Sequence, residues 1–447
     1  MARFPRTFLI LGAIIAATVP VKVDRLDLAP QGAALSAQFK QLSGPPDEFA
    51  DMAPADPVRS ATHSKSALLP VVLEDDGSGR WVWQSDIPLE ARHLRFAVVS
   101  GTSRFGAPVA GNSQSWTVAL RRTTGAAAPE EVAAIGSQSF GLSAGSGIPA
   151  TYYVFQGLDP GTGQLSISSA GPGQGFVLIE GSGATRLLSH QVSFDQRVGR
   201  RIGILAHVYD RDNGSQPLRL GNVEDAVLRV VAPDGTVTTS GMYDDGLRGD
   251  GGAGDGVYGG DFAADVAGAF NAQVIVRGRD NVGTGFVRTA EHSIPIVEDR
   301  IDLGGQEAVV DVLSEHRLRI RVGVVTDQPT RHYRVVAQVW GAATPGAAPS
   351  RPVAWVGGMV AIADGSLNLG FDRRWITRAG AFEPFELRHL RVEDPDVYVT
   401  VASADRLRIV MPTLPATILR GDQIAIDDEM LVGPRPATLP AANNLYT

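Results

Sequence analysis

Short runs in which apolar and polar residues alternate recur along most of this chain. In the clearest run, apolar residues hold every second position and arginines hold the positions between them: Leu318, Ile320, Val322 and Val324, with Arg317, Arg319 and Arg321. Because successive side chains of a strand point to opposite faces, this run predicts a strand with one buried and one solvated face. Similar short runs predict strands at residues 81–83, 94–99, 116–120, 176–179, 202–209, 227–231, 272–276, 333–340, 354–361 and 387–392.

Turn-forming residues separate the apolar runs. The chain has 51 glycines and 28 prolines, spread between the runs rather than gathered in one region. Pro233-Asp-Gly235 predicts a tight hairpin turn, and Asp280 to Gly283 predicts a turn before the last strand of its block. Many short strands with frequent turns favour an all-β architecture.

The runs fall into three blocks, and a chain of 447 residues is too long for one core. We therefore expect three immunoglobulin-like or related β-sandwich domains in series, at residues 67–197, 198–300 and 301–432. The middle block packs its strands and turns into about 100 residues, as an immunoglobulin-like sandwich requires.

The segments outside these blocks have different character. Arg3, Arg6 and a short apolar run at residues 8–17 predict a signal peptide at residues 1–20, because the run is too short to span a bilayer. A retained amino-terminal anchor is the alternative. Residues 21–66, with one weak helical stretch at 33–42, are expected to form a linker with limited order, and residues 433–447 a loose tail. The chain is expected to be exported, with a periplasmic, cell-surface or secreted location and no further membrane span.

Composition excludes several classes of function. The formal net charge is −8, which argues against nucleic acid as a partner, since phosphate backbones require a concentrated basic face. The chain contains no cysteine. Disulfides, a thiol nucleophile, a cysteine-based zinc site and an iron–sulfur cluster are therefore excluded.

The Asp/Gly loop, residues 243–258, is the most distinctive chemical feature of the sequence. It carries four carboxylates separated by glycines: Asp244, Asp245, Asp250 and Asp255. Glycine tolerates positive φ, so the segment can fold back on itself and bring oxygen ligands together around a hard cation such as calcium. The four aspartates are accordingly the candidate metal ligands.

A simpler interpretation of the loop is that Asp-Gly pairs form turns, with each aspartate hydrogen-bonded to nearby backbone. The loop lacks the closing glutamate of a helix-loop-helix calcium site and does not repeat as a β-roll does. Asp210 and Asp212 form a second, weaker acidic turn, for which the turn interpretation is preferred.

No catalytic residue is predicted. Gly141-Leu-Ser-Ala-Gly145 matches the Gly-x-Ser-x-Gly nucleophile pattern, but the Ser-Gly-Ile-Pro that follows cannot start the required helix cleanly. Trp81 and Trp83 share one face of a strand, where core packing is preferred over stacking on sugars. The histidines are scattered, and none shows the spacing of a helical metal site: His63, His93, His190, His207, His292, His316, His332 and His389.

Several segments resemble a bacterial family, domain-of-unknown-function family 4785. They are residues 242–246 with 254–258, 333–340, 352–359 and 387–395. The middle block also resembles bacterial surface immunoglobulin-like modules, whose late hairpin carries an Asp-Asn-x-Gly turn, as here at Asp280 to Gly283. The resemblance implies three β-sandwich domains and export, and it implies no reaction.

Two functional hypotheses follow. The first is a non-catalytic binding or structural protein of the periplasm or cell surface, calcium-braced in its middle domain, with an unknown protein or glycan ligand. The alternative is a secreted hydrolase acting on polysaccharide or peptide, with its site at a domain junction. Flat, filled sandwiches favour the first, and ionisable side chains that converge in a deep pocket favour the second.

Overall fold

A computed structural model describes residues 42–52, 56–100, 116–122, 130–136, 150–211, 222–298, 300–412, 424, 426 and 428–431. The expected signal peptide, nearly all of the weak helical stretch, the Gly141–Gly145 motif, Asp212 and the carboxyl tail lie outside these residues. The regular elements of the described part are almost all strands, which confirms the all-β prediction.

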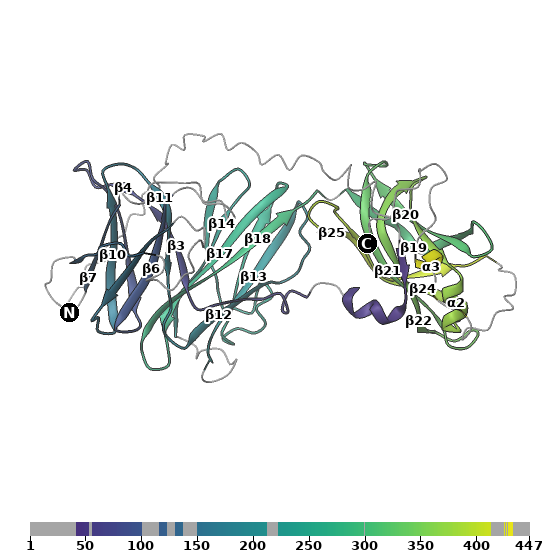
Figure 1. Cartoon of the computed structure of the whole chain (residues 1–447), viewed down its shortest axis with the longest axis horizontal. Helices are drawn as coiled ribbons and strands as arrows, with labels where there is room; N and C mark the ends of the chain where they lie inside the picture. The colour runs from purple at the N-terminus through teal and green to yellow at the C-terminus, as the bar shows by residue number, and fades with distance from the viewer. Residues whose placement is uncertain are drawn as a thin grey trace, which may run out of the picture. The chain divides into compact units, whose positions relative to one another are not determined.

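The first domain is a sandwich of two antiparallel sheets (Figure 1). The four-stranded sheet contains β3 (Ala67–Val72), β11 (Gln174–Ile179), β6 (His93–Ser100) and β9 (Thr151–Gln156). The five-stranded sheet contains β4 (Glu74–Asp75), β5 (Trp81–Leu89), β10 (Gly161–Ser169), β7 (Thr117–Arg122) and β8 (Glu130–Glu131). Trp81 and Trp83 pack against the core between the sheets, as expected.

The second domain is a sandwich of two four-stranded sheets. One contains β2 (Thr62–Ser64), β12 (Thr185–Gln191), β13 (Arg200–Asp210) and β16 (Val257–Ala264). The other contains β15 (Val237–Gly241), β14 (Val223–Val231), β17 (Gly268–Arg279) and β18 (Gly285–Ile296). The expected Pro233–Gly235 turn closes the β14–β15 hairpin, where Ala232 N–H donates to Thr236 O at 2.9 Å.

The boundary between the first two domains lies earlier than residue 197, where we expected it. β12 pairs with β13 from Thr185↔Asp210 to Gln191↔Ile204, so it belongs to the second domain. Its apolar content is limited to the adjacent Leu187 and Leu188, which Ser189 and His190 follow, and the sequence pattern alone does not show which block it joins. Only its pairing with β13 assigns β12 to the second domain.

The third domain is one eight-stranded sheet in the order β1, β22, β21, β24, β25, β19, β20, β23. β22 also pairs with β23, so the sheet closes on itself and β1 is added outside this closure. The strands are β1 (Leu42–Gly44), β19 (Ile301–Val312), β20 (Arg317–Thr326), β21 (His332–Ala342), β22 (Pro349–Ala363), β23 (Ser366–Asp372), β24 (Phe382–Glu393) and β25 (Thr400–Val410). Two short helices, α2 (Arg374–Ala379) and α3 (Asp428–Leu431), accompany it.

The alternating run in β20 behaves as predicted. Leu318, Ile320, Val322 and Val324 are buried in the core of the third domain. On the opposite face, Arg319 and Arg321 both pair with Asp311 of the neighbouring strand, at 2.7 and 2.9 Å. The period of two in the sequence was therefore sufficient to fix which residues face the core.

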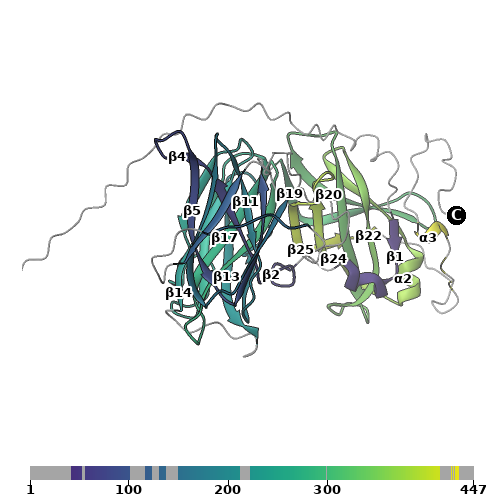
Figure 2. The same cartoon turned by 60° about the vertical axis from the view of Figure 1, so that its left-hand side comes forward.

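Part of the expected amino-terminal linker is ordered, which corrects that prediction. β1 pairs with β22 in the third domain (Figure 2), and a 3-10 helix, η1 (Pro46–Met52), follows it. β2 then pairs with β12 in the second domain. These elements are too short to show a hydrophobic period, and β1 and β2 are ordered because each completes the edge of an existing sheet.

The first and second domains share buried contacts. Ile275 and Val287, on the second domain, belong to the apolar core of the first. Leu68 N–H donates to Thr289 Oγ1 at 2.8 Å, and Thr289 N–H donates to Ser66 O at 3.1 Å. The two sandwiches are therefore joined by core packing as well as by the chain. Among the described residues, no helix has the length and apolar content that crossing a membrane requires.

Candidate functional site

The Asp/Gly loop connects β15 to β16, and its own backbone hydrogen-bonds the first of the predicted carboxylates. Asp244 Oδ1 accepts hydrogen bonds from the N–H groups of Gly254 and Asp255 at 2.6 and 3.1 Å. Asp244 Oδ2 accepts one from Gly256 at 2.9 Å. Gly254 and Gly256 have φ of 81° and 87°, so glycine is needed where the backbone wraps around this carboxylate.

The other three predicted aspartates are bonded in the same way. Asp250 is buried, and its Oδ2 accepts hydrogen bonds from the N–H groups of Asp245 and Gly246 at 3.1 and 3.2 Å. Asp245 forms an ion pair with Arg248 at 2.9 Å. Asp255 accepts hydrogen bonds from two backbone N–H groups of the loop. Asp250 Oδ1 is buried and has no hydrogen-bond partner.

The loop therefore satisfies the turn interpretation. Within the described part of the chain, which includes the whole loop, no group of three or more histidine or acidic side chains is placed to hold a metal ion. Calcium binding by Asp244, Asp245, Asp250 and Asp255 remains a prediction.

Folding brings one serine next to a histidine that lies far from it in the sequence. Ser189 Oγ lies 2.8 Å from His292 Nε2. The pair is not arranged for nucleophilic catalysis, because Ser189 is fully buried and its hydroxyl donates to Leu205 O at 2.8 Å. Burial lowers the pKa of His292 to about 4, so the ring is neutral at physiological pH. This contact has a structural role.

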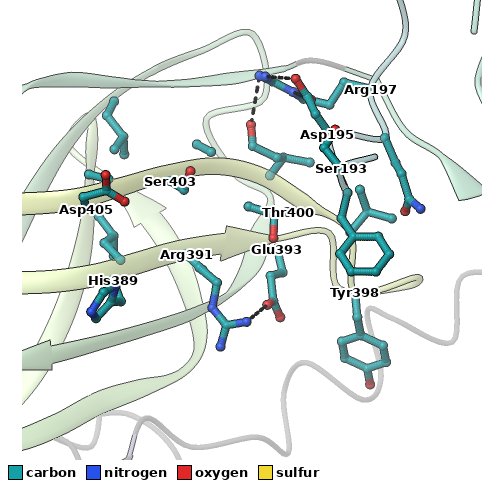
Figure 3. Close-up of a pocket in the computed structure, with 18 of the residues that line it drawn as sticks. Ser193, Asp195, Arg197, His389, Arg391, Glu393, Tyr398, Thr400, Ser403 and Asp405 are labelled. Atoms are coloured by element: carbon teal, nitrogen blue, oxygen red, sulfur yellow. Dashed lines mark hydrogen bonds and ion pairs between the residues drawn. The ribbon is translucent and has the colours of Figure 1, made fainter. Parts of the chain in front are cut away.

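A large cleft lies where the loop after β12 meets the third domain (Figure 3). Its volume is about 1410 Å³, and it is lined by residues within 191–197, 302–306 and 389–407. On the wall formed by residues 191–197, an ion pair between Asp195 and Arg197 holds the side chains in place. Asp195 binds the Arg197 guanidinium at 2.5 and 3.1 Å, and this hydrogen bonding lowers the pKa of the Asp195 carboxyl. Arg197 also donates to Val401 O at 3.4 Å across the cleft.

The opposite wall is the β24–β25 hairpin, and its turn is tightly bonded. Tyr398 N–H donates to Asp394 O at 2.9 Å, and Asp394 N–H donates to Val399 O at 2.8 Å. Arg331 binds the Asp394 carboxylate at 2.5 Å. Tyr398 is left 63% exposed, and Arg334 lies over its ring at 5.4 Å from the centroid.

Ion pairs also fix the side chain of Glu393, which precedes this turn on β24. Glu393 is only 3% exposed and pairs with Arg334 and with Arg391, the latter at 3.5 Å. Figure 3 shows Arg391 and Glu393 together on β24, with Ser403 and Asp405 on β25. Ser403 and Asp405 are exposed in the cleft. The cleft thus offers donors, acceptors and one aromatic ring on a braced framework.

Two residues of the cleft have a backbone conformation that is costly for their type. His389 and Tyr398 have φ of 51° and 58°, in the left-handed region that non-glycine residues seldom occupy. Such strain persists only where surrounding structure enforces it, and it gathers at functional sites. His389 is skipped in the β24–β25 ladder, between Arg388 and Leu390, and Tyr398 lies in the turn that joins the two strands.

Sequence reasoning did not identify these residues as a site. The segment 387–395 is predicted to contain a strand and to resemble the family, but it carries no predicted site residue. Two signals were available: His389 interrupts an apolar alternation, and Asp394-Pro-Asp396 is an unusually polar turn. Neither signal shows that residues 191–197 and 302–306 lie on the same cleft, since that proximity is created by folding.

Family models match each domain separately. The first, second and third immunoglobulin-like domains of conditioned medium factor match residues 66–179, 185–296 and 334–434. Conditioned medium factor of Dictyostelium discoideum is 25% identical over 255 residues, which cover 51% of this chain and 36% of the relative. The match therefore spans little more than a third of that protein's length.

Solved structures with similar folds include a DUF4785 family protein from Legionella pneumophila. It has 12% sequence identity and a TM-score of 0.47, and the alignment covers 77% of this chain and 89% of that one. Fibronectin(III)-like modules from Clostridium thermocellum align with 11% identity and a TM-score of 0.21, over 52% of this chain and 92% of that one. The three family-model matches are in chain order and correspond to the three domains. They show that this chain belongs to the family of proteins that carry the three immunoglobulin-like domains of conditioned medium factor.

Proposed function

We propose that this chain is an exported, non-catalytic binding protein whose ligand lies in the cleft between residues 191–197 and the β24–β25 hairpin. The observation that carries the proposal is the enforced left-handed backbone of His389 and Tyr398, whose exposed side chains line this cleft. Backbone strain of this kind is held in place by the surrounding structure and is often found at sites that clamp a ligand.

The electrostatic arrangement of the cleft supports binding rather than turnover. Asp195 is paired with Arg197, whose hydrogen bond lowers the pKa of the Asp195 carboxyl, and Glu393 is ion-paired with Arg334 and Arg391. A general acid requires the opposite environment, one that raises the pKa of a carboxyl. Paired charges and exposed hydroxyl groups instead provide fixed hydrogen-bonding positions for a polar ligand.

Export is supported by two observations of different kinds. The amino-terminal sequence has the charge and apolar pattern of a signal peptide. The Dictyostelium relative is named for conditioned medium, the fluid outside cells. The mature protein from the producing cell is therefore expected outside the cytosol, with an amino terminus near residues 17–25. An intact Met1 on protein from the cytosol would contradict export.

Replacing Tyr398 by glycine allows the effect on ligand binding to be measured separately from the effect on protein stability. Tyr398→Gly removes the ring and relieves the left-handed strain, so it should raise the free energy of unfolding by about 1 kcal/mol and weaken ligand binding at least tenfold. Asp364→Gly is the matched control, because Asp364 also has a left-handed backbone, with φ of 50°, and does not line the cleft. It should gain stability and leave binding unchanged.

Peptide and glycan arrays are probed with the wild-type chain to find ligands. The same arrays are then probed with both variants, and the binding of each ligand is compared with its binding to the wild type. If every ligand that binds the wild type binds Tyr398→Gly equally well, the cleft is not the binding site.

A further inference from the structure

The cleft lies where two neighbouring strands of the third domain's sheet, β19 and β25, stop pairing with each other. β19 and β25 pair in parallel at only three positions, Glu307↔Arg408, Ala308↔Ile409 and Val309↔Val410. Before these positions, residues 400–407 of β25 pair with β24 alone among the described strands. Residues 302–306 of β19 and 400–407 of β25 instead line the cleft. An interior strand of the sheet therefore has one open edge along most of its length.

β19 leaves this edge because of its own irregularity. Its register against β20 shifts between Leu303 and Ala308, which means that residues 304–307 bulge out of the ladder. Gly304 and Gly305 lie in this bulge. A bulge bends the strand and ends regular pairing, and bulges are common beside functional sites. The open edge of β25 thus follows from how β19 is built.

The side chains of β25 change character along the open edge. Val401, Leu407 and Ile409 are buried in the core, whereas Ser403 and Asp405, which continue the same alternation between them, are exposed. The neighbouring Ala402 and Ala404 are small. A chain can therefore approach the backbone of β25 closely here. In addition, Arg197 Nη1 donates to Val401 O, so a donor from outside the sheet already reaches this edge.

We propose that the ligand of the cleft is an extended polypeptide segment from a partner protein, which adds as a strand to β25 along residues 400–407. This inference rests on the proposed function and names its ligand class. A strand edge presents donors and acceptors at the spacing of a polypeptide backbone, and a glycan does not reproduce that spacing. At about 3.3 Å per residue, the edge fits a segment of roughly six to eight residues.

The charged side chains that line the cleft limit which peptide sequences can bind along β25. Both acidic and basic side chains line the cleft at the open edge: Asp302, Asp405, Arg391 and Arg406. A strongly acidic or strongly basic segment would meet like charges in either register, and like charges directly opposite each other destabilise a strand pair. We therefore expect a polar segment without an excess of charge of either sign.

The test begins with a phage library of random linear dodecapeptides, panned on the full chain and counter-selected on Ser403→Trp. The tryptophan fills the open edge, and unchanged thermal unfolding shows that this variant is folded. Thr239→Trp, at an exposed position on β15 of the second domain, is the matched control. Selected peptides should bind the wild type and Thr239→Trp equally and bind Ser403→Trp at least tenfold more weakly. If Ser403→Trp does not fold, Asp405→Trp replaces it.

Backbone methylation then tests strand addition itself. Only alternate residues of an added strand donate to the neighbouring strand. N-methylation of the selected peptide at one set of alternate residues should weaken binding at least tenfold, and methylation of the other set should have little effect. Equal effects of both sets, or the failure to select any peptide that depends on Ser403, overturn the inference. If a glycan instead binds in a Ser403-dependent way, the cleft remains the binding site and only the strand-addition inference fails. Ligands that are all insensitive to Ser403→Trp overturn both.

Discussion

Arg288 of the second domain forms a buried ion pair with Glu90 of the first. Nη1 lies 2.5 Å from Oε1 and Nη2 lies 2.9 Å from Oε2, and the side chains are 1% and 8% exposed. Arg288 also donates to Thr185 O at 3.0 Å, and Gly183 N–H donates to Glu90 Oε2 at 2.7 Å. Both charges are therefore paired and hydrogen-bonded, which is the condition for a buried ion pair to be tolerated.

Breaking this pair from one side should be costly. Arg288→Ala leaves the Glu90 carboxylate buried without its counter-charge, and we expect the free energy of unfolding to fall by about 3–5 kcal/mol. The double variant Glu90→Gln, Arg288→Met removes both charges. Its free energy of unfolding should fall by less than that of Arg288→Ala alone. Calorimetric unfolding of the three proteins gives the comparison. A double variant less stable than Arg288→Ala would contradict the unpaired Glu90 carboxylate as the source of the cost.

Glu291 should make the same junction sensitive to pH. Burial raises the pKa of its carboxyl to about 7, although hydrogen bonds from Gln273 and Thr289 and the charge of Arg229 oppose the shift. Gln273 Nε2 bridges Glu291 Oε1 at 2.6 Å and Leu68 O of the first domain at 2.7 Å. Protonation of Glu291 therefore affects a residue that contacts both domains.

The sign of this effect follows from the raised pKa. The folded state holds the proton more tightly than the unfolded state, so the stabilisation is complete below pH 4.5 and is lost as the pH rises to about 7. The full difference amounts to about 3 kcal/mol. Glu291→Gln mimics the protonated carboxyl, so its melting temperature should match that of the wild type at pH 4.5 and exceed it at pH 8. An equal difference at both pH values would show that Glu291 does not titrate in this range.

The Asp/Gly loop should be stabilised by Asp244 whether or not calcium is present. Asp244→Ala removes the acceptor for three backbone N–H groups, and we expect a loss of about 1–3 kcal/mol in the free energy of unfolding. The measurement is thermal unfolding of the wild type and the variant, each with added calcium and with chelator. A wild-type melting temperature that rises with calcium, together with loss of that rise in Asp244→Ala, would establish the predicted ion site.

Gly44 should be required for the amino-terminal strand to pair with β22. A Cβ atom at this position would lie 2.6 Å from Trp355 Cε2 and 2.8 Å from Glu48 Oε2, so Gly44→Ala forces the tryptophan to move. We expect a loss of about 1–3 kcal/mol, typical of overpacking. Gly323→Ala in β20 is the control, because a Cβ atom there meets nothing within 4 Å. Limited proteolysis after residue 52 should be faster in Gly44→Ala only.

The fold class could be predicted from local pattern because a strand records its two faces in every second residue. Leu318 to Val324 show this most clearly, since all four apolar positions are buried and the arginines between them are not part of the core. The hairpin turn at Pro233 to Gly235 was equally readable, because turn chemistry is local. β12 was not assigned correctly, since its apolar content is limited to Leu187 and Leu188 and only its pairing with β13 shows the domain to which it belongs.

The sequence by itself determined about half of the strands, several turns, the three-block organisation and the position of the acidic loop. All of these depend on neighbours within a few residues. The tertiary structure decided that residues 42–44 complete a sheet whose other strands begin at residue 301, that Arg288 meets Glu90, and that Asp195 and Tyr398 line one cleft. These contacts join residues that are far apart in the chain, and they depend on sheet edges and bulges formed only when the domains pack. No local period encodes them, which is why the candidate site emerged only from the folded chain.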